Sequence, residues 1–332
     1  MRIAVDAFGS DKAPFPEIEG VIQAIKEDLC DEIMLVGDES ILRQELEKYY
    51  YDSGRIRVSH ASQRITMEDS AAAAVRGKKD SSMVRAVDLH QSGETDAVIS
   101  AGNSGAFMSA SLMAYGRIKG VSRPAIAVTL PTMKRPEILL DMGANVDCDA
   151  ENLLQFAQLG SIYSSYIYQI DRPRVALLNI GEESAKGNLM SREAHRLLAG
   201  SADLNFIGNI EGKDVLKGIC DVIVCDGFVG NVVLKTLEGA VISIFEILKE
   251  QFNKDWIAKF GAILSYPVYK YLKRKLDHTE FGGALLVGLN GTSIVCHGSS
   301  NATSIKNAVR FACRTAKTGF VRHTKEYFEG IQ

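Results

Sequence analysis

The chain has 332 residues, which is enough for one large α/β domain or two small ones. Its 46% hydrophobic and 24% charged residues are typical of a soluble globular protein, and its net charge of −3 provides no overall basic field for nucleic acid. No apolar run approaches the ~20 residues that a membrane span needs, and the first residues predict a strand rather than a secretion signal. The six scattered cysteines lack a metal-binding spacing, so we expect reduced thiols, a cytoplasmic location, and neither a metal nor a cofactor.

Strands and helices alternate along the whole chain. Runs of β-favouring residues predict strands at 2–6, 33–36, 55–60, 96–100, 125–130, 138–142, 174–180, 204–207, 222–225 and 292–296. Apolar positions at helical spacing predict helices from Pro14 to about 26 and at 39–50, 69–79, 81–91, 106–115, 149–169, 191–198, 231–251 and 302–322. The alternation indicates an α/β sandwich on a largely parallel sheet, with 125–130 and 138–142 as a candidate antiparallel pair. No repeat or linker divides the chain, so we expect a single domain over 1–332.

Two strand-to-helix turns have the composition of an anion-binding site. After the strand at 222–225 the chain reads Asp226-Gly-Phe-Val-Gly-Asn231, and after the strand at 96–100 it reads Ala-Gly-Asn103-Ser104-Gly105. Such turns direct backbone N–H groups and the positive end of a helix dipole toward the carboxyl edge of the sheet, which suits a phosphate or a carboxylate. The alternative is that the same residues only form the corner, with Asn231 as a helix N-cap.

Residues 252–277 combine aromatic and basic side chains, Trp256 and Lys254 among them, within a helical arm that we place at about 237–280. Lysines beside aromatic residues suit a membrane surface that bears anionic lipid. A dimer surface is an alternative, and Pro267 interrupts any continuous amphipathic helix.

Short motifs follow one another in order over nearly the whole chain: Ile3-Ala-Val-Asp6-Ala7, Ser100-Ala-Gly-Asn-Ser-Gly-Ala106, Gly116-Arg-Ile-Lys-Gly120, Arg123-Pro-Ala125, Leu140-Asp-Met-Gly-Ala-Asn-Val-Asp147, Lys186-Gly-Asn188, Asp226-Gly-Phe-Val-Gly-Asn-Val232 and His297-Gly-Ser-Ser300. With these motifs the chain resembles the bacterial phosphate acyltransferases, the acyl-ACP:phosphate acyltransferases of phospholipid synthesis. One departure is at Phe8 and Ser10, where that family usually has methionine and glycine. For such an enzyme, an acyl-chain groove is a further alternative for residues 252–277.

The resemblance implies a homodimer with an isopropylmalate dehydrogenase-like, three-layer α/β/α sandwich and a protruding helical arm, without a nucleotide. It also implies transfer of a long fatty acyl group from the thioester of acyl carrier protein to inorganic phosphate. The products are acyl-phosphate and free carrier protein, and a membrane glycerol-3-phosphate acyltransferase consumes the acyl-phosphate. A cytoplasmic protein with peripheral membrane contact would fit this sequence of reactions.

The catalytic candidates within this resemblance are Lys186, Asn231, Asp226 and His297. Phosphate is itself a nucleophile, so the site must hold a dianion beside a thioester carbonyl and stabilise the developing oxyanion. We expect Lys186 and Asn231 to neutralise charge, an aspartate to orient one of them or hold a proton, and His297 to protonate the departing thiolate. A solvated loop lysine and a structural histidine are the alternatives. Contacts to phosphate or to the acyl carbonyl are expected from Asn103, Ser104, Gly105, Asp6, Asn145, Asn188 and Ser299.

Two basic clusters could bind the acidic carrier protein, although charge runs are usually solvated surface. They consist of Arg76, Lys78 and Lys79, and of Arg117, Lys119 and Arg123. Two other functions remain open: a short-chain phosphotransacylase that uses acyl-CoA, and a non-catalytic scaffold for the carrier protein or the membrane. A dehydrogenase is disfavoured because no GxGxxG follows a strand with a downstream acidic residue.

Overall fold

The computed structural model describes residues 1–276 and 282–330, so residues 277–280 of the expected arm lie outside the described part. The strands are β1 (Arg2–Asp6), β2 (Glu32–Gly37), β3 (Ile56–His60), β4 (Ala97–Ser100), β5 (Ala125–Leu130), β6 (Glu137–Leu140), β7 (Arg174–Asn179), β8 (Asn205–Glu211), β9 (Val222–Val224), β10 (Ala284–Val287) and β11 (Ser293–Val295). The helices are α1 (Phe15–Lys26), α2 (Glu39–Leu46), α3 (Ala71–Gly77), α4 (Ser82–Gln91), α5 (Ser104–Tyr115), α6 (Ala150–Ile167), α7 (Leu189–Gly200), α8 (Gly227–Phe252), α9 (Trp256–Leu276), α10 (Ala302–Thr318) and α11 (Phe320–Gly330).

All of these strands belong to one sheet, in the order β3-β2-β1-β4-β11-β10-β5-β6-β9-β7-β8. Seven of the neighbouring pairs are parallel, and the antiparallel pairs are β10–β11, β10–β5 and β5–β6. The expected antiparallel pairing of the strands at 125–130 and 138–142 is therefore confirmed. Because β6 reverses direction relative to β5, the strands of the β6-β9-β7-β8 half end at the opposite edge from β1, β4, β11 and β5.

We call the edge at which β1, β4, β11 and β5 end the first edge, and the edge at which β6, β9 and β7 end the second edge. Asp6 and the turn at 101–105 lie at the first edge, whereas Asp226 lies at the second. Ligand sites in α/β sheets gather beyond the carboxyl ends of strands. The reversal at β6 therefore gives this fold two separate places where such a site could form.

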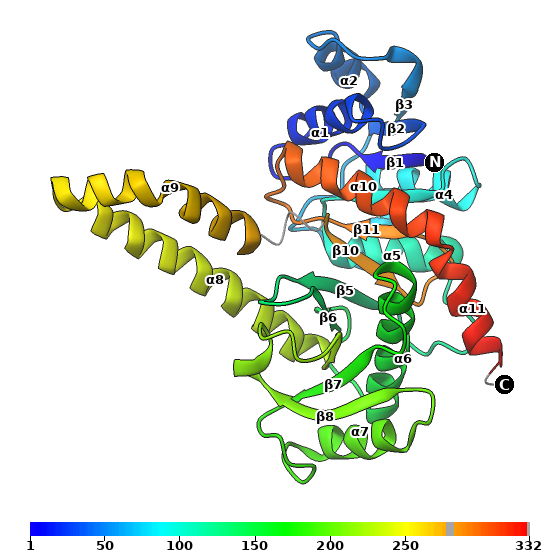
Figure 1. Ribbon diagram of the computed structural model, residues 1–332. Coiled ribbons are helices and arrows are strands. Elements are labelled where there is room, and N and C mark those ends of the chain that lie inside the picture. The colour runs from blue at the N-terminus through cyan, green and yellow to red at the C-terminus, as the bar shows by residue number, and fades with distance from the viewer. Residues whose placement is uncertain (277–281, 331–332) are drawn as a thin grey trace.

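Helices cover both faces of the sheet, which makes the three layers of an α/β/α sandwich (Figure 1). One core contains Ile3 and Val5 of β1 with side chains of α1, α6 and α10. The other contains Ala4 of the same strand with side chains of α4, α5 and the start of α8. Successive residues of a strand point to opposite faces, so one apolar strand supplies both cores. The expected fold class is confirmed.

The C-terminal part of α8 and all of α9 form a helical hairpin that projects from the sheet (Figure 1). By length and composition α8 could cross a membrane, with a mean hydropathy of 1.5 over its most apolar window, so the expectation that no stretch is apolar enough is wrong for this helix. Its first turns are buried against the sheet through Gly227, Gly230 and Leu234, which ties this end to the globular body.

The structure corrects three other expectations. The helix expected at 231–251 starts at Gly227, four residues earlier, because Asp226 is its N-cap. The single final helix is two helices, since Gly319 adopts a left-handed conformation with φ 65° and ends α10. The strand β10 was not predicted, because its four residues directly follow Gly282 and Gly283, whose composition indicated only a break.

Candidate functional site

The start of α8 is fixed by an aspartate and a glycine. The Asp226 carboxylate accepts a hydrogen bond from the backbone N of Val229 at 2.8 Å, which caps the helix. A Cβ on Gly230 would lie 1.9 Å from the backbone O of Asp141, so only glycine allows the helix to pack this closely on the loop after β6. Asn231 is therefore not the cap. It lies one turn inside α8, exposed, with its side chain beside Gly143.

Asp141 organises the loop after β6 at the second edge. Its buried carboxylate accepts hydrogen bonds from the backbone N of Ile126, Ala144 and Asn145, at 3.0, 3.1 and 2.6 Å. Burial raises the pKa of Asp141, and these hydrogen bonds oppose the shift. The Asn145 amide donates to Asp141 and to the backbone O of Pro124, so in this structure the Asn145 side chain supports the loop.

The other expected residues of the second edge lie in the loop after β7. Gly187, with φ 94°, forms the turn, and Asn188 caps α7 by accepting from the backbone N of Ser191 at 2.8 Å. Lys186 is exposed. A cavity of about 410 Å³ next to this loop is lined by both Asn188 and Asp226, together with apolar residues of β7 and α8.

Asp6 and the turn of α5 lie at the first edge. The buried Asp6 carboxylate accepts a hydrogen bond from Ser100 Oγ at 2.7 Å, and burial raises the pKa of Asp6. Asn103 caps α5, and its Nδ2 donates to the backbone O of Met67 and of Asp69, both at 3.2 Å. The Asn103 amide thus joins two loops. Ser104 and Gly105 are exposed in the first turn of the helix.

A lysine and a histidine meet at the first edge, and the sequence did not single out the lysine. Lys235 Nζ lies 3.2 Å from Nε2 of His297 and 2.7 Å from Oε2 of Glu238. His297 Nδ1 lies 2.7 Å from Ser299 Oγ. An ammonium group can only donate, so Nε2 is the acceptor in this contact and the ring proton lies on Nδ1, which donates to Ser299 Oγ. The Ser299 backbone N also lies 3.2 Å from Nδ1, and the shorter Oγ contact together with the ammonium favours this tautomer.

Helix α8 links the two edges. Asn231 and Lys235 are four residues apart, so they lie on the same side of the helix, one turn from each other. Asn231 is beside Gly143 of the second edge, and Lys235 contacts His297 of the first. The spacing Asn231-Val-Val-Leu-Lys235 was the signal that could have identified Lys235 from the sequence.

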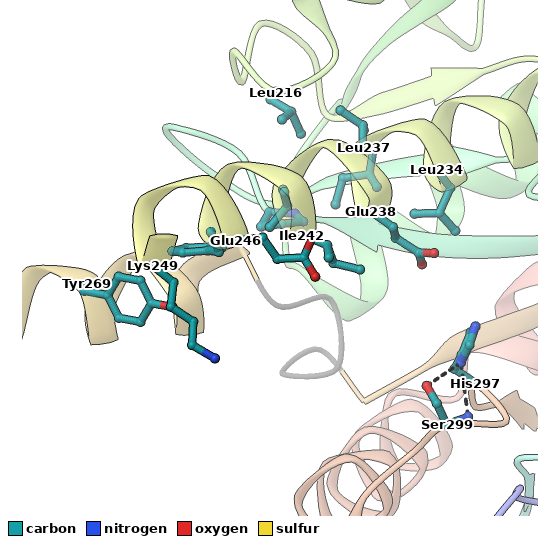
Figure 2. A pocket seen from close by; sticks show the side chains of 14 residues that line it. Leu216, Leu234, Leu237, Glu238, Ile242, Glu246, Lys249, Tyr269, His297 and Ser299 are labelled. Atoms are coloured by element: carbon teal, nitrogen blue, oxygen red, sulfur yellow. Dashed lines mark hydrogen bonds between the residues drawn. The ribbon is translucent and has the colours of Figure 1, made fainter. Parts of the chain in front are cut away.

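An apolar groove of about 450 Å³ starts at His297 and Ser299 and follows α8 outward (Figure 2). Leu234, Leu237, Val241 and Ile242 of α8 form one wall. The groove is also lined by Leu130 at the end of β5, Pro131 directly after it, Leu216 after β8 and Tyr269 of α9. Glu238, Phe245, Glu246 and Lys249 complete the lining. The groove therefore connects a polar end at the first edge to the helical hairpin.

The two basic clusters lie at different edges. Lys78 is paired with Asp69 at 2.6 Å, and the Asp69 backbone O accepts from Asn103, so the cluster of Arg76, Lys78 and Lys79 is next to the first edge. Arg76 and Lys79 are exposed. In the other cluster, Arg123 donates to the backbone O of Asp147 at 2.9 Å. That cluster, with Arg117 and Lys119, precedes β5 and lies at the second edge. Within the described ranges, no three His, Cys, Asp or Glu side chains are placed to hold a metal ion.

Comparison with known proteins identifies the family of this chain. A family profile described as "Fatty acid synthesis protein" matches residues 1–323. The phosphate acyltransferase of Dictyoglomus turgidum is 45% identical over 100% of this chain and 98% of that protein. The phosphate acyltransferase of Pelotomaculum thermopropionicum is 47% identical over 100% of this chain and 96% of that protein.

Solved structures share the fold at low sequence identity. A phosphotransacetylase from Streptococcus pyogenes superposes with a TM-score of 0.60 at 16% identity, covering 96% of this chain and 94% of that one. A 4-hydroxythreonine-4-phosphate dehydrogenase from Klebsiella pneumoniae gives a TM-score of 0.54 at 12% identity, covering 95% and 99%. These likenesses establish the architecture alone. On the family profile and the full-length relatives, the chain belongs to the phosphate acyltransferase family of enzymes.

Proposed function

We propose that this enzyme transfers a long-chain fatty acyl group from the thioester of acyl carrier protein to inorganic phosphate, for phospholipid synthesis. The observation that carries the proposal is the Lys235–His297 pair at the mouth of a long apolar groove. An acetyl group would leave such a groove empty, whereas a long chain would bury most of its methylene groups there. Lysine and histidine side chains next to the groove suit the charges of an acyl transfer to phosphate.

The reaction needs one bond to form and one to break. An oxygen of hydrogen phosphate attacks the thioester carbonyl, and the carbonyl oxygen becomes negatively charged in a tetrahedral intermediate. The C–S bond then breaks, the phosphate proton passes to the sulfur, and acyl-phosphate and a free thiol result. We assign stabilisation of the oxyanion to Lys235, and transfer of the proton to the thiolate to His297, because its Nε2 faces Lys235.

Asn231 and Lys186 are the proposed phosphate ligands, from two different positions. Asn231 lies one turn from Lys235 on the same side of α8, so its amide could hold a phosphate oxygen next to the thioester. Lys186 and Asn188 belong to the second edge, where Asp226 and Asn188 line the smaller cavity. Ser299, Ser104 and Gly105 are proposed contacts of the first edge. For Asp6, Asn103 and Asn145 we propose a supporting role, because their polar atoms bond the surrounding loops.

The basic cluster next to the first edge is the proposed docking site for acyl carrier protein. Arg76 and Lys79 are exposed there, and a carrier bound to them would approach the end of the groove at His297. The cluster of Arg117, Lys119 and Arg123 lies at the other edge of the sheet, which makes it the weaker candidate.

The helical hairpin is the proposed contact for a second copy of the chain and for the membrane. Trp256, Ile257 and Phe260 of α9 are 77%, 65% and 60% exposed, a degree of exposure that large apolar side chains rarely show together without a partner. A homodimer with peripheral membrane contact in the cytoplasm would let acyl-phosphate pass to a glycerol-3-phosphate acyltransferase in the membrane.

The test is turnover of long-chain acyl carrier protein with inorganic phosphate, with acyl-phosphate detected by mass spectrometry. We expect phosphate-dependent product from the carrier-protein donor and much less from acetyl-CoA. Product from short-chain acyl-CoA alone would make the enzyme a short-chain phosphotransacylase. Carrier-protein binding without turnover on either donor would favour the scaffold.

A further inference from the structure

We propose that the groove along α8 is the site of the donor's acyl chain, and that the rings of Phe245 and Tyr269 close its far end and set the longest chain accepted. This inference rests on the proposed function and adds to it the place of the chain and the residues that measure its length. The two rings meet edge to face with centroids 5.0 Å apart, and they join α8 to α9. Both residues line the groove.

The length of the groove fits a fatty acyl chain. From Lys235 to Phe245, α8 advances by roughly 15 Å at about 1.5 Å per residue. An extended hydrocarbon advances about 1.25 Å per carbon, from a bond of ~1.5 Å and a near-tetrahedral angle, so roughly twelve carbons span that distance.

The distribution of polarity orients the chain. His297 and Ser299 lie at one end of the groove, and the walls between this end and Phe245 are formed mainly by leucine, valine and isoleucine. A thioester carbonyl therefore belongs at the His297 end, with the methyl end toward Phe245. Glu238 is paired with Lys235, and Glu246 is exposed, so it can line the groove with its stem while its carboxylate stays in water.

The chain-length limit follows from steric closure. Each methylene group that enters the groove contributes about fourfold in affinity, from about 0.8 kcal/mol of burial. That gain ends where the paired rings block the path. Removing one ring extends the groove, and a larger side chain at Val241, nearer to His297, shortens it.

The experiment measures two readouts on the full chain and on two groove variants. One readout is kcat/KM for carrier-protein donors with 8, 12, 14, 16 and 18 carbons, and the other is direct calorimetric binding of the free fatty acids of the same lengths. Phe245→Ala is expected to raise the ratio of kcat/KM for the 16-carbon donor to kcat/KM for the 12-carbon donor at least tenfold. Val241→Trp is expected to move the optimum to the 8-carbon donor, because the six residues from Lys235 to Val241 span roughly 9 Å, or about seven carbons. Ile244→Ala and Ile244→Trp are the matched controls, because Ile244 is 56% exposed on α8 and does not line the groove.

The two readouts separate the inference from the proposed function. If the fatty acids bind with the expected shifts in chain length but no donor is turned over, the proposed function fails and the acyl site stands. If donors are turned over but both groove variants change kcat/KM by the same factor for every chain length, the function stands and the inference is overturned. Conversion of a dimer to a monomer by Val241→Trp with an unchanged chain preference would also overturn it, by assigning the groove to a second copy of the chain.

Discussion

Lys235 Nζ lies 3.2 Å from Nε2 of His297, a residue 62 positions further along the chain. Lys235 comes from the third turn of α8, and His297 comes from the loop after β11. Because α8 follows β9, and β9 and β11 are separated by three strands of the sheet, the two side chains meet only in the folded protein. The pair brings together the residues of the two halves of the fold, and it stands at the polar end of the groove. We therefore expect it to dominate the chemistry.

Replacing Lys235 tests that expectation directly. Lys235→Ala should lower kcat/KM for long-chain acyl carrier protein by about 10²- to 10³-fold, as loss of an oxyanion donor does in other enzymes. Lys254→Ala, at an exposed lysine of the hairpin, should leave the activity unchanged. Steady-state kinetics with phosphate varied would show whether the loss lies in kcat or in the KM for phosphate.

The variant Lys186→Ala, measured beside Lys235→Ala, tests where the phosphate binds. A large rise in the KM for phosphate in this variant would assign the anion to the loop after β7. Full activity of Lys235→Ala together with an inactive Lys186→Ala would move the chemistry to the second edge of the sheet and contradict the assignment to the Lys235–His297 pair.

Charge reversal distinguishes the two candidate docking surfaces. The double variant Arg76→Glu/Lys79→Glu should raise the KM for acyl carrier protein about tenfold or more and reduce its dependence on salt, with kcat little changed, because exposed charges mainly affect association. Arg117→Glu/Lys119→Glu is the matched double variant at the opposite edge. The docking assignment is wrong if only this second variant raises the KM for acyl carrier protein.

Glu17 predicts how stability depends on pH. Its side chain is buried beside Ser10, and burial raises its pKa from the usual 4.5 to about 7. A carboxyl group with a raised pKa binds its proton more tightly in the folded protein, so the folded state loses stability as pH rises from about 4.5 to 7 and the loss is constant above 7. The full effect is on the order of 3 kcal/mol from this group, at about 1.4 kcal/mol per pKa unit.

Glu17→Gln should remove this penalty and keep the acceptor for the backbone N of Ser10. Thermal unfolding at pH 8 is expected to show a more stable variant, and the difference should shrink toward pH 5. Equal shifts of the midpoint at both pH values would mean that Glu17 keeps an ordinary pKa in the folded protein.

Replacement by alanine should change the free energy of unfolding in opposite directions at two glycines of α8. Gly230→Ala places a Cβ 1.9 Å from the backbone O of Asp141, so the helix or the loop must move, and we expect a loss of at least ~3 kcal/mol in the free energy of unfolding. Gly239→Ala meets nothing within 4 Å and should gain about 0.5–1 kcal/mol from the higher helix propensity of alanine. Chemical denaturation of the two variants measures both effects, and similar changes in both would show that the Asp141 contact does not constrain α8.

Local composition was sufficient to predict most elements of this fold. The strand at 125–130 and the helix ending at Lys26 have the bounds that their residues indicate, because apolar periodicity reflects which face is buried. The end of α10 was missed since Gly319 interrupts a continuous helical pattern by a left-handed conformation, which composition alone does not distinguish from a tolerated helical glycine. The start of α8 was misplaced because Asp226 and Asn231 are both good caps, and only the packing of Gly230 on Asp141 selects Asp226.

The sequence by itself determined the α/β class, the two glycine turns and the motifs of the family, because these depend on short segments and their order. Only the tertiary structure decided how the motifs are distributed in space. The sequence already suggested the antiparallel pairing of β5 and β6, but it did not indicate that β1, β4 and β11 lie on the β5 side of this pair and β9 and β7 on the β6 side. This strand order places Asn103 and His297 at one edge of the sheet and Lys186 and Asp226 at the other. The order of strands that are distant in the sequence depends on long-range pairing, which no local pattern encodes, and the same pairing brings Lys235 to His297.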